Sequence, residues 1–395
     1  MEDKTVRRGI LDVLIEELET CTDYRDSMRV YYSMTEILFL TFCGIMCGCE
    51  SYEDIADYGK LKLDWLRKYL PYPNGTPSHD TLNRGLNMLN VKELSRVLEK
   101  VSSYEIPLLT GKTLHIDGKS LSGSATIKEL QTKKANGGKQ ALHTVNVFCS
   151  SLQACLASVP IAEKGGEQQV VINLLDVLDF KGSLLTLDAN FCHKDVVKAI
   201  HEHGADYLIG LKSNQPKLLA AAVDLLSQTE EPCISIHTGD QEKGHGRIEK
   251  RDCFIISLEE LPKAKKENYD AIVSEWANLK SFIKINSYRK IIATGKEEEE
   301  TRYYIFSKKD NASNTNNTVR DHWCVENQLH WFLDTAFGED RSRKRNSNAA
   351  FAFSIFRKIA LAKLKNFSDP KVSIKRKMRK CAMSNTYLEN ILSIS

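Results

Sequence analysis

Apolar residues recur at helical spacing through the first hundred positions and predict an N-terminal helical region, residues 1–105. The run Pro-Tyr-Pro-Asn-Gly at 71–75 breaks this pattern, and Ser78 is placed to cap a short helix after it. That helix would present Asn83 and Arg84. A helix-turn-helix that binds DNA ends and a small bundle that only packs both fit this arrangement.

At residue 106 the pattern changes to short apolar runs that alternate with helical segments. Three consecutive strands followed by alternating helices and strands predict a mixed sheet with helices packed on it. We assign residues 106–228 to the first part of this α/β (α+β) core. The expected strands are residues 113–117, 144–150, 154–161, 183–188 and 206–211, and the expected helices are residues 167–178, 194–202 and 215–226.

Residues 229–312 are rich in strand-like runs and predict a β-rich insertion within the core. Residues 295–300, GKEEEE, suit an exposed hairpin tip, and residues 311–317 suit a polar linker. The second part of the core, residues 313–370, contains a long amphipathic helix at 348–364. The strands expected in the insertion are residues 233–238, 251–257, 282–288, 291–293 and 302–306.

A helix is expected within residues 320–346, where four polar residues spaced four apart share one face. Apolar residues on the same helix form a packing surface, and two tryptophans suit either the core or stacking on DNA. A zinc site on this face is set aside, because the paired-histidine motif of zinc hydrolases is absent. The polar row is His322, Glu326, His330 and Asp334; the apolar residues are Val325, Leu329 and Leu333; the tryptophans are Trp323 and Trp331.

Two aspartates, Asp117 and Asp188, each follow an apolar strand and precede small or polar residues. Carboxylates at the carboxyl ends of neighbouring strands converge at one edge of a sheet. Glu326, on a helix packed against that sheet, would add a third carboxylate. Converging carboxylates favour a bound cation, and oxygen ligands favour Mg²⁺ or Mn²⁺. For either aspartate alone, a turn or strand-end cap is the commoner role.

Several motifs resemble the transposases of H-repeat-associated insertion sequences, a family of DDE transposases. They are LHIDGKSLSGS, HTV at 143–145, LLTLDANFCHK, DYLIGLKSNQ, HGRIEKR and HWxxENxLHWxLDxxFxEDxxR. The segments SYEDIADYG and PSHDTLNR resemble the domain that accompanies this family's catalytic core. The resemblance covers nearly the whole chain. Ser122 and His193 depart from it, since a basic residue and a glutamine are expected at these two positions.

The resemblance implies an RNase H-like core interrupted by a β-rich insertion. It also implies that Asp117, Asp188 and Glu326 form the catalytic and metal-binding triad. Two Mg²⁺ or Mn²⁺ ions would then clamp the attacking and leaving oxygens of a phosphodiester, roughly 3.5–4 Å apart.

Further residues are candidates for contact with DNA or for support of the triad. Lys119 could meet a phosphate, although a solvated lysine fits nearly as well. Asp334, Glu339 and Asp340 are expected to pair with the basic run at 341–345. The full set of DNA-contact candidates is Lys119, Lys212, Asn214, His245, Arg247, Arg251, Arg341, Arg343, Arg345, Asn83 and Arg84, and the supporting candidates are His143, Trp323, Asn327 and His330.

The formal net charge is only +3, but the charge is unevenly distributed. Residues 341–380 contain fourteen Lys or Arg and one acid, Asp369, a local net charge of +13. Together with an expected basic C-terminal tail, residues 371–395, this asymmetry points to a polyanion. The eleven cysteines lie mostly in apolar segments and suit reduced core thiols. Together with the resemblance to insertion-sequence transposases, this implies a cytoplasmic protein associated with the bacterial nucleoid.

These observations predict a DNA transposase that hydrolyses phosphodiester bonds at element ends and joins the 3′-hydroxyls to target DNA. Its partners would be terminal inverted repeats, target DNA and a second copy of the chain, as a homodimer on DNA. Two alternatives stay open. One is an RNase H-like metal-dependent nuclease without strand transfer, and the other is a non-catalytic DNA-binding relic of a transposase.

Overall fold

The computed structural model describes residues 9–26, 28, 30–106, 108–124, 141–161, 166–228, 234–244 and 246–393. The chain forms two compact units. Unit 1 comprises Met1–Leu108, Gly118–Lys164 and Glu326–Ser395, and unit 2 comprises Leu109–Asp117 and Gly165–Val325. No helix in the described ranges is long and apolar enough to cross a membrane.

Unit 1 is mainly helical. Short polar residues define where its helices begin: the Ser33 and Ser51 hydroxyls accept from the backbone N–H groups three residues ahead, and each pairs with an acidic residue in a capping box. The helices are α1 (Ile10–Glu19), α2 (Met34–Met46), α3 (Tyr52–Leu66), α4 (His79–Asn87), α5 (Val91–Glu105), α13 (Trp331–Thr335), α14 (Ser347–Asn366), α15 (Ile374–Met383) and α16 (Asn385–Leu392).

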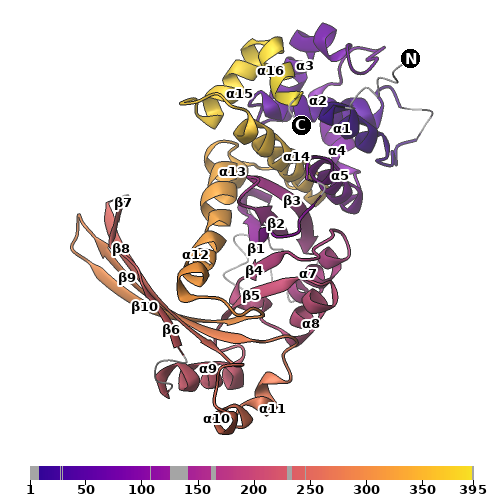
Figure 1. Cartoon of the computed structure of the whole chain (residues 1–395). Helices are drawn as coiled ribbons and strands as arrows, with labels where there is room; N and C mark the ends of the chain where they lie inside the picture. The colour runs from indigo at the N-terminus through magenta and orange to yellow at the C-terminus, as the bar shows by residue number, and fades with distance from the viewer. Residues whose placement is uncertain are drawn as a thin grey trace, which may run out of the picture. The chain divides into compact units, whose positions relative to one another are not determined.

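Helix α14 is the centre of unit 1 and contacts α5, α2, α4 and strand β3 (Figure 1). It was expected to be amphipathic, but Ala349–Leu364 is buried on every side. The expected basic tail instead forms α15 and α16, which pack on each other and on α14. The connection between α3 and α4, residues 67–78, is twelve residues long. A helix-turn-helix uses three or four, so α3 and α4 do not form that motif.

One sheet contains ten strands in the order β3-β2-β1-β4-β5-β10-β9-β8-β6, with β7 paired to β8. Strands β1, β4 and β5 are mutually parallel, and β2 and β3 form an antiparallel hairpin. Together with flanking helices and the inserted strands β6–β10, this order confirms the predicted RNase H-like α/β fold. The core strands are β1 (Thr113–Leu121), β2 (Leu142–Cys149), β3 (Ala154–Ile161), β4 (Leu184–Leu187) and β5 (Asp206–Leu211).

In unit 2, helix α8 lies against β5 and α7, and α12 packs on β6, β8 and β4. The long strands β8, β9 and β10 extend as a twisted ribbon, with β7 near its tip (Figure 1). The helices are α7 (Glu167–Leu175), α8 (Lys194–Glu202), α9 (Pro216–Gln228), α10 (Lys263–Glu267), α11 (Asp270–Val273) and α12 (Ala312–His322); the inserted strands are β6 (Ile234–Thr238), β7 (Glu242–Gly244), β8 (Arg247–Ser257), β9 (Ser281–Ile291) and β10 (Glu297–Phe306).

Three element predictions in this region were wrong. Residues 291–293 are not a strand of their own, because β9 runs unbroken to Ile291 and a turn follows. Glu297–Glu300 belongs to strand β10 and pairs with β9, so the hairpin tip is shorter than expected. Residues 311–317 are not a linker: the Asn311 side chain accepts from the Asn314 backbone N–H and caps α12.

Candidate active site

Asp117 lies on β1 and Asp188 directly follows β4, and these two strands are parallel neighbours in unit 2. The register pairs Ile116 with Leu187, so the next residues are Asp117, within β1, and Asp188, which directly follows the end of β4. Adjacent strands are about 4.8 Å apart, and the two carboxylates therefore start from neighbouring positions. Asp117 does not end its strand as predicted, because β1 continues to Leu121.

Local contacts hold the Asp188 carboxylate in place. One of its oxygens accepts from the Ala189 backbone N–H at 2.7 Å and begins a short turn. The Asn214 amide donates to the Ala189 carbonyl at 2.9 Å and so braces that turn. The Lys212 ammonium, which is 64% exposed, lies 3.6 Å from the Asp188 carboxylate. Two predicted DNA contacts, Lys212 and Asn214, thus lie beside Asp188.

The stretch that carries Glu326 is not one continuous α-helix. Between α12 and α13, residues Val325–His330 form a π-helical turn. Because π-helical bonds run from residue i to i+5, residues four apart no longer stack in a straight row. The predicted polar face is consequently divided. His322 bonds to Thr186 at 2.8 Å, His330 lies 3.4 Å from the Glu326 carboxylate, and Asp334 bonds elsewhere.

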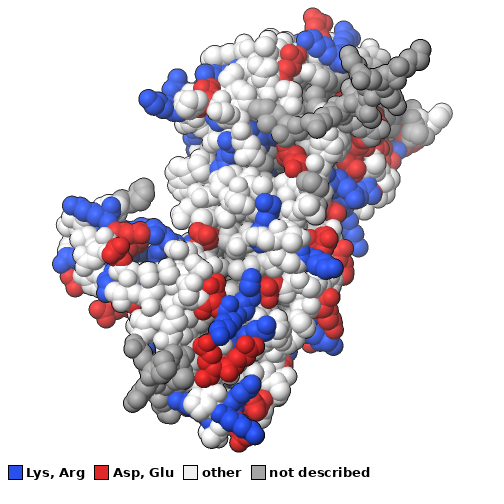
Figure 2. Space-filling model, in the orientation of Figure 1, with Lys and Arg blue, Asp and Glu red and all other residues white. Residues whose placement is uncertain are grey.

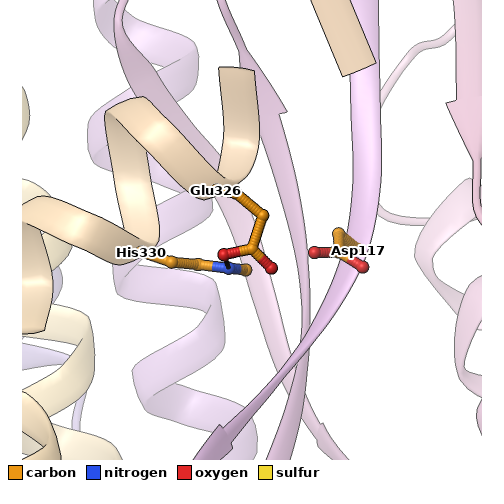
Figure 3. Close-up of side chains that lie close together, drawn as sticks. All are labelled: Asp117, Glu326 and His330. Atoms are coloured by element: carbon orange, nitrogen blue, oxygen red, sulfur yellow. Dashed lines mark ion pairs between the residues drawn. The ribbon is translucent and has the colours of Figure 1, made fainter. Parts of the chain in front are cut away.

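Asp117, Glu326 and His330 lie close together (Figure 3). Asp117 is the last residue of its segment of unit 2, and the next residue of strand β1, Gly118, belongs to unit 1. A ligand atom from each of the three residues lies within 4.8 Å of the others. The Glu326 side chain is 54% exposed, whereas His330 is buried. Two carboxylates and one imidazole suit Mn²⁺ better than Mg²⁺, because Mg²⁺ prefers oxygen ligands. Either ion can bind to this donor set.

The structure gives Lys119 a role other than the predicted phosphate contact. Its side chain is only 8% exposed, and its ammonium donates to both Asp334 carboxylate oxygens at 2.9 and 2.8 Å. The buried Glu339 carboxylate lies 3.9 Å from the same ammonium and 3.9 Å from the Arg357 guanidinium. Asp334 and Glu339 therefore pair with internal cations and not with the basic run at 341–345. Burial raises the pKa of Asp334, and Lys119 opposes that rise.

The basic run lines a pocket of about 330 Å³ together with residues at the start of α3. Lys344 donates to the Glu50 carbonyl at 2.8 Å and lies over the Phe353 ring. Burial, and then the Arg357 charge, lower the pKa of Lys344 to about 8. Arg341 is 71% exposed and lies 3.8 Å from the Glu50 carboxylate. Arg343 also lines the pocket, whereas Arg345 donates to the Gly123 carbonyl at 3.4 Å.

Not all of the positive charge concentrated between residues 341 and 380 lies on the surface. Four of the fourteen basic residues between positions 341 and 380 are buried. Lys358 donates to the hydroxyls of Ser158 and Ser354, and Lys377 donates to two backbone carbonyls. These residues satisfy internal acceptors and do not add to a polyanion-binding surface. The four are Arg357, Lys358, Lys363 and Lys377.

In the insertion, Arg247 and Arg251 both pair with Glu249, at 2.7 and 3.6 Å. His245 lies outside the described residues. Figure 2 shows Lys and Arg mixed with Asp and Glu on this ribbon, so its visible face does not carry one sign of charge.

The remaining candidates differ in exposure. Asn83 and Arg84 are exposed on α4, and Asn327 is exposed on the π-helical turn. His143 bonds to the Ser120 hydroxyl at 2.9 Å. Trp323 and Trp331 are 43% and 55% exposed, so neither is a core residue, and the Arg302 guanidinium stacks on Trp323. Of the two departures from the family pattern, Ser122 is exposed and His193 bonds to Gln168 at 2.7 Å.

Sequence reasoning missed a hydrogen-bonded chain in unit 2, His115–Thr186–His322, in which His115 and Thr186 are buried and His322 is half-buried. The Thr186 hydroxyl lies 2.7 Å from a His115 ring nitrogen and 2.8 Å from a His322 ring nitrogen. Burial lowers the pKa of His115 to about 3. The available signal was strand alternation, because His115 and Thr186 stand two residues before Asp117 and Asp188 and so share their faces.

Comparison with known proteins gives a consistent family. Residues 110–362 match a family model described as "Transposase DDE domain", and residues 15–101 match one described as "DDE_Tnp_1-associated". The chain is 33% identical to "H repeat-associated putative transposase YhhI" of Escherichia coli K12, over 97% of this chain and 98% of that protein. It is 32% identical to "Putative transposase YncI" of Escherichia coli O157:H7, over 96% and 94%.

Among solved structures, the chain aligns with a piggyBac transposase in a synaptic complex with hairpin DNA. The TM-score is 0.43 and the sequence identity 11%, over 97% of this chain and 79% of that one. The family models and the full-length relatives together show that the chain belongs to the H repeat-associated family of DDE transposases.

Proposed function

We propose that the chain is an insertion-sequence transposase whose catalytic residues are Asp117, Asp188 and Glu326. The observation that supports this most directly is the register of β1 and β4, in which Asp117 and Asp188 are the residues that follow the paired Ile116 and Leu187. Glu326 lies beside Asp117, together with the His330 ring. Family membership supplies the reaction class, and these residues supply a donor set for divalent cations.

Two Mg²⁺ or Mn²⁺ ions held by these carboxylates would activate the attacking oxygen and stabilise the leaving oxygen of a phosphodiester. The contribution of the surrounding residues is to hold these carboxylates in position. Asp117 lies on β1 and Asp188 directly follows its parallel partner β4, and the Ala189 backbone N–H orients the Asp188 carboxylate. The Glu326 carboxylate is held near the His330 ring. Water is the nucleophile in cleavage at an element end, and the freed 3′-hydroxyl is the nucleophile in joining to target DNA.

DNA would contact both units. In unit 1, Arg341 and Arg343 are exposed beside the pocket and suit bidentate contacts with backbone phosphates. Exposed Asn83 and Arg84 on α4 suit contacts with the terminal repeat. In unit 2, Lys212 beside Asp188 suits the phosphate next to the scissile bond. Because two ends must be joined to one target, we also propose a homodimer on DNA.

The test uses duplexes that cover the DNA flanking the gene, a target plasmid and Mg²⁺. The wild-type chain should cut at the element ends and yield joined products. Asp188→Asn and Glu326→Gln should lose both products while still binding DNA. Glu202→Gln, which changes an exposed carboxylate on α8, should behave as wild type.

The alternatives give different results in the same assay. Cleavage without joined product would indicate a nuclease and overturn the strand-transfer proposal. A wild-type chain that binds the ends yet cuts nothing in Mg²⁺ or Mn²⁺ would indicate a DNA-binding relic.

A further inference from the structure

A single buried hydroxyl connects the three elements that lead to the candidate catalytic residues. Thr186 is fully buried on β4, and its oxygen lies 2.7 Å from His115 Nδ1 on β1 and 2.8 Å from His322 Nδ1 at the end of α12. All three residues belong to unit 2. His115 lies between the apolar Leu114 and Ile116 on β1, and Thr186 lies between Leu185 and Leu187 on β4.

Each of these three residues precedes one member of the candidate triad by a few positions in the sequence. His115 and Thr186 are paired in the register of β1 and β4, and each stands two residues before Asp117 or Asp188. Residues two apart on a strand point to the same face of the sheet. His322 is the last residue of α12 and stands four residues before Glu326. On β1 and at the end of β4, the hydrogen-bonded chain therefore lies one same-face step before the Asp117 and Asp188 carboxylates.

Hydrogen bonding restricts how these three residues can be arranged. A threonine hydroxyl has one proton and two lone pairs, so Thr186 can donate to at most one of the two imidazoles and must accept from the other. The tautomers of the two rings are therefore coupled through the hydroxyl, and neither strand can slide without breaking a bond to it. An apolar side chain would fill the same space without the cost of burying polar groups. A fully paired polar network instead fixes a unique geometry.

We infer that Thr186 is a positioning residue, which sets the spacing of the Asp117 and Asp188 carboxylates by tying β1, β4 and the end of α12 together. This inference rests on the proposed function, because it assumes that these carboxylates hold divalent ions. It assigns no role in the chemical step to the hydroxyl itself. Its expected effect is on metal affinity, since residues that orient metal ligands typically change affinity by about 10–100-fold when removed.

The experiment measures Mn²⁺ binding to the full chain by calorimetry, for the wild type and three variants. Thr186→Val keeps the shape and removes the hydroxyl, and Thr186→Ser keeps the hydroxyl. Thr315→Val is the matched control, because Thr315 is also a fully buried threonine of unit 2 and its hydroxyl has no partner within the described residues. We expect the dissociation constant for Mn²⁺ to rise about tenfold or more in Thr186→Val. It should stay within about threefold of wild type in the other two variants.

Cleavage assays then separate the two proposals. In Thr186→Val, the Mn²⁺ concentration needed for half-maximal cleavage should rise, while the KM for DNA should stay the same. If the wild type binds Mn²⁺ but never cleaves, the proposed function fails, and the Mn²⁺ affinities still decide the role of Thr186. If the wild type cleaves and Thr186→Val matches its Mn²⁺ affinity and requirement, the positioning role is overturned and the function stands.

Two further outcomes are decisive. If Thr186→Val does not fold, Thr186→Ser must still bind Mn²⁺ as the wild type does, and His322→Phe must bind it more weakly. If the wild type binds no Mn²⁺, with or without the end duplex, the positioning inference is overturned.

Discussion

Replacing Lys119 by methionine should destabilise the protein strongly, because the ammonium is the shared partner of two internal carboxylates. Methionine keeps the length and the apolar stem of lysine but removes the charge. The Asp334 carboxylate then loses both of its hydrogen bonds from Lys119, at 2.9 and 2.8 Å. The Glu339 carboxylate, which is 1% exposed, loses the ammonium 3.9 Å away and keeps the Arg357 guanidinium at 3.9 Å.

The size of this effect follows from burial. Removing one member of a buried ion pair costs about 3–5 kcal/mol, because the other charge is left uncompensated. For a unit of 150–250 residues, 1 kcal/mol shifts the melting temperature by about 2–4 °C, so we expect a loss of roughly 6–20 °C. Asp334→Asn should cost less, because the Asp334 side chain is 31% exposed and Lys119 keeps Glu339 as a partner.

The loss should depend on pH in a defined direction. Burial already raises the pKa of Asp334, and removing Lys119 removes the group that opposes this rise. A carboxyl whose folded-state pKa lies above its unfolded value destabilises the fold when ionised and stops doing so when protonated. The deficit of Lys119→Met relative to wild type should therefore shrink as pH falls from 7 toward 5.

Thermal melts followed by circular dichroism at pH 5, 6 and 7 measure both effects. The control is Lys60→Met, whose partner Asp57 lies in an exposed pair with side chains 69% and 70% accessible. Such a pair contributes about 0–1 kcal/mol, so this variant should melt close to wild type at every pH. A Lys119→Met chain that melts like Lys60→Met, or loses one phosphate contact in DNA-binding titrations, would refute the internal role of Lys119.

Three further predictions concern the basic residues. The double change Arg341→Gln and Arg343→Gln should weaken DNA binding at all sequences and reduce the slope of log K against log salt concentration by about 2. The control Lys266→Gln, at an exposed lysine, should change neither quantity. Binding titrations from about 50 to 200 mM salt measure both. Lys358→Met should leave that salt dependence unchanged, because Lys358 is buried on serine hydroxyls. The folded-state pKa of Lys344, about 8, lies below its ordinary value of 10.5, so the unfolded chain binds more protons between these two pH values. The stability of the wild type relative to Lys344→Met should therefore rise with pH, as thermal melts from about pH 7.5 to 9.5 would measure.

Much of the core could be predicted because buried strands leave a clear pattern in the sequence. Residues 154–161 and 206–211 were predicted with the bounds that the structure has, since each is a continuous apolar run between turn residues. The same pattern located Asp117 and Asp188 beside one another, because both follow such runs. The capping role of Ser78 was also predictable from its hydroxyl, which accepts from the Thr81 backbone N–H.

Burial of charge could not be predicted in the same way, because it depends on partners far away in the sequence. Lys363 pairs with Glu105, 258 residues earlier, and Lys358 donates to Ser158, 200 residues earlier. A local count of lysines and arginines treats these residues as surface charge. Their helix α14 also has alanines and phenylalanines on every side, so neither composition nor period separates its buried cations from exposed ones.

The π-helical turn explains why one regular sequence pattern serves separate purposes. In a straight α-helix, His322, Glu326, His330 and Asp334 would form a single polar stripe with a common environment. The wider turn at Val325–His330 breaks the stripe, and its members take different partners. His322 is directed to the Thr186 hydroxyl, Glu326 and His330 remain paired with each other, and Asp334 reaches Lys119. Since π-helical turns often occur at functional sites, this irregularity is itself consistent with selection for the placement of Glu326 over helical regularity.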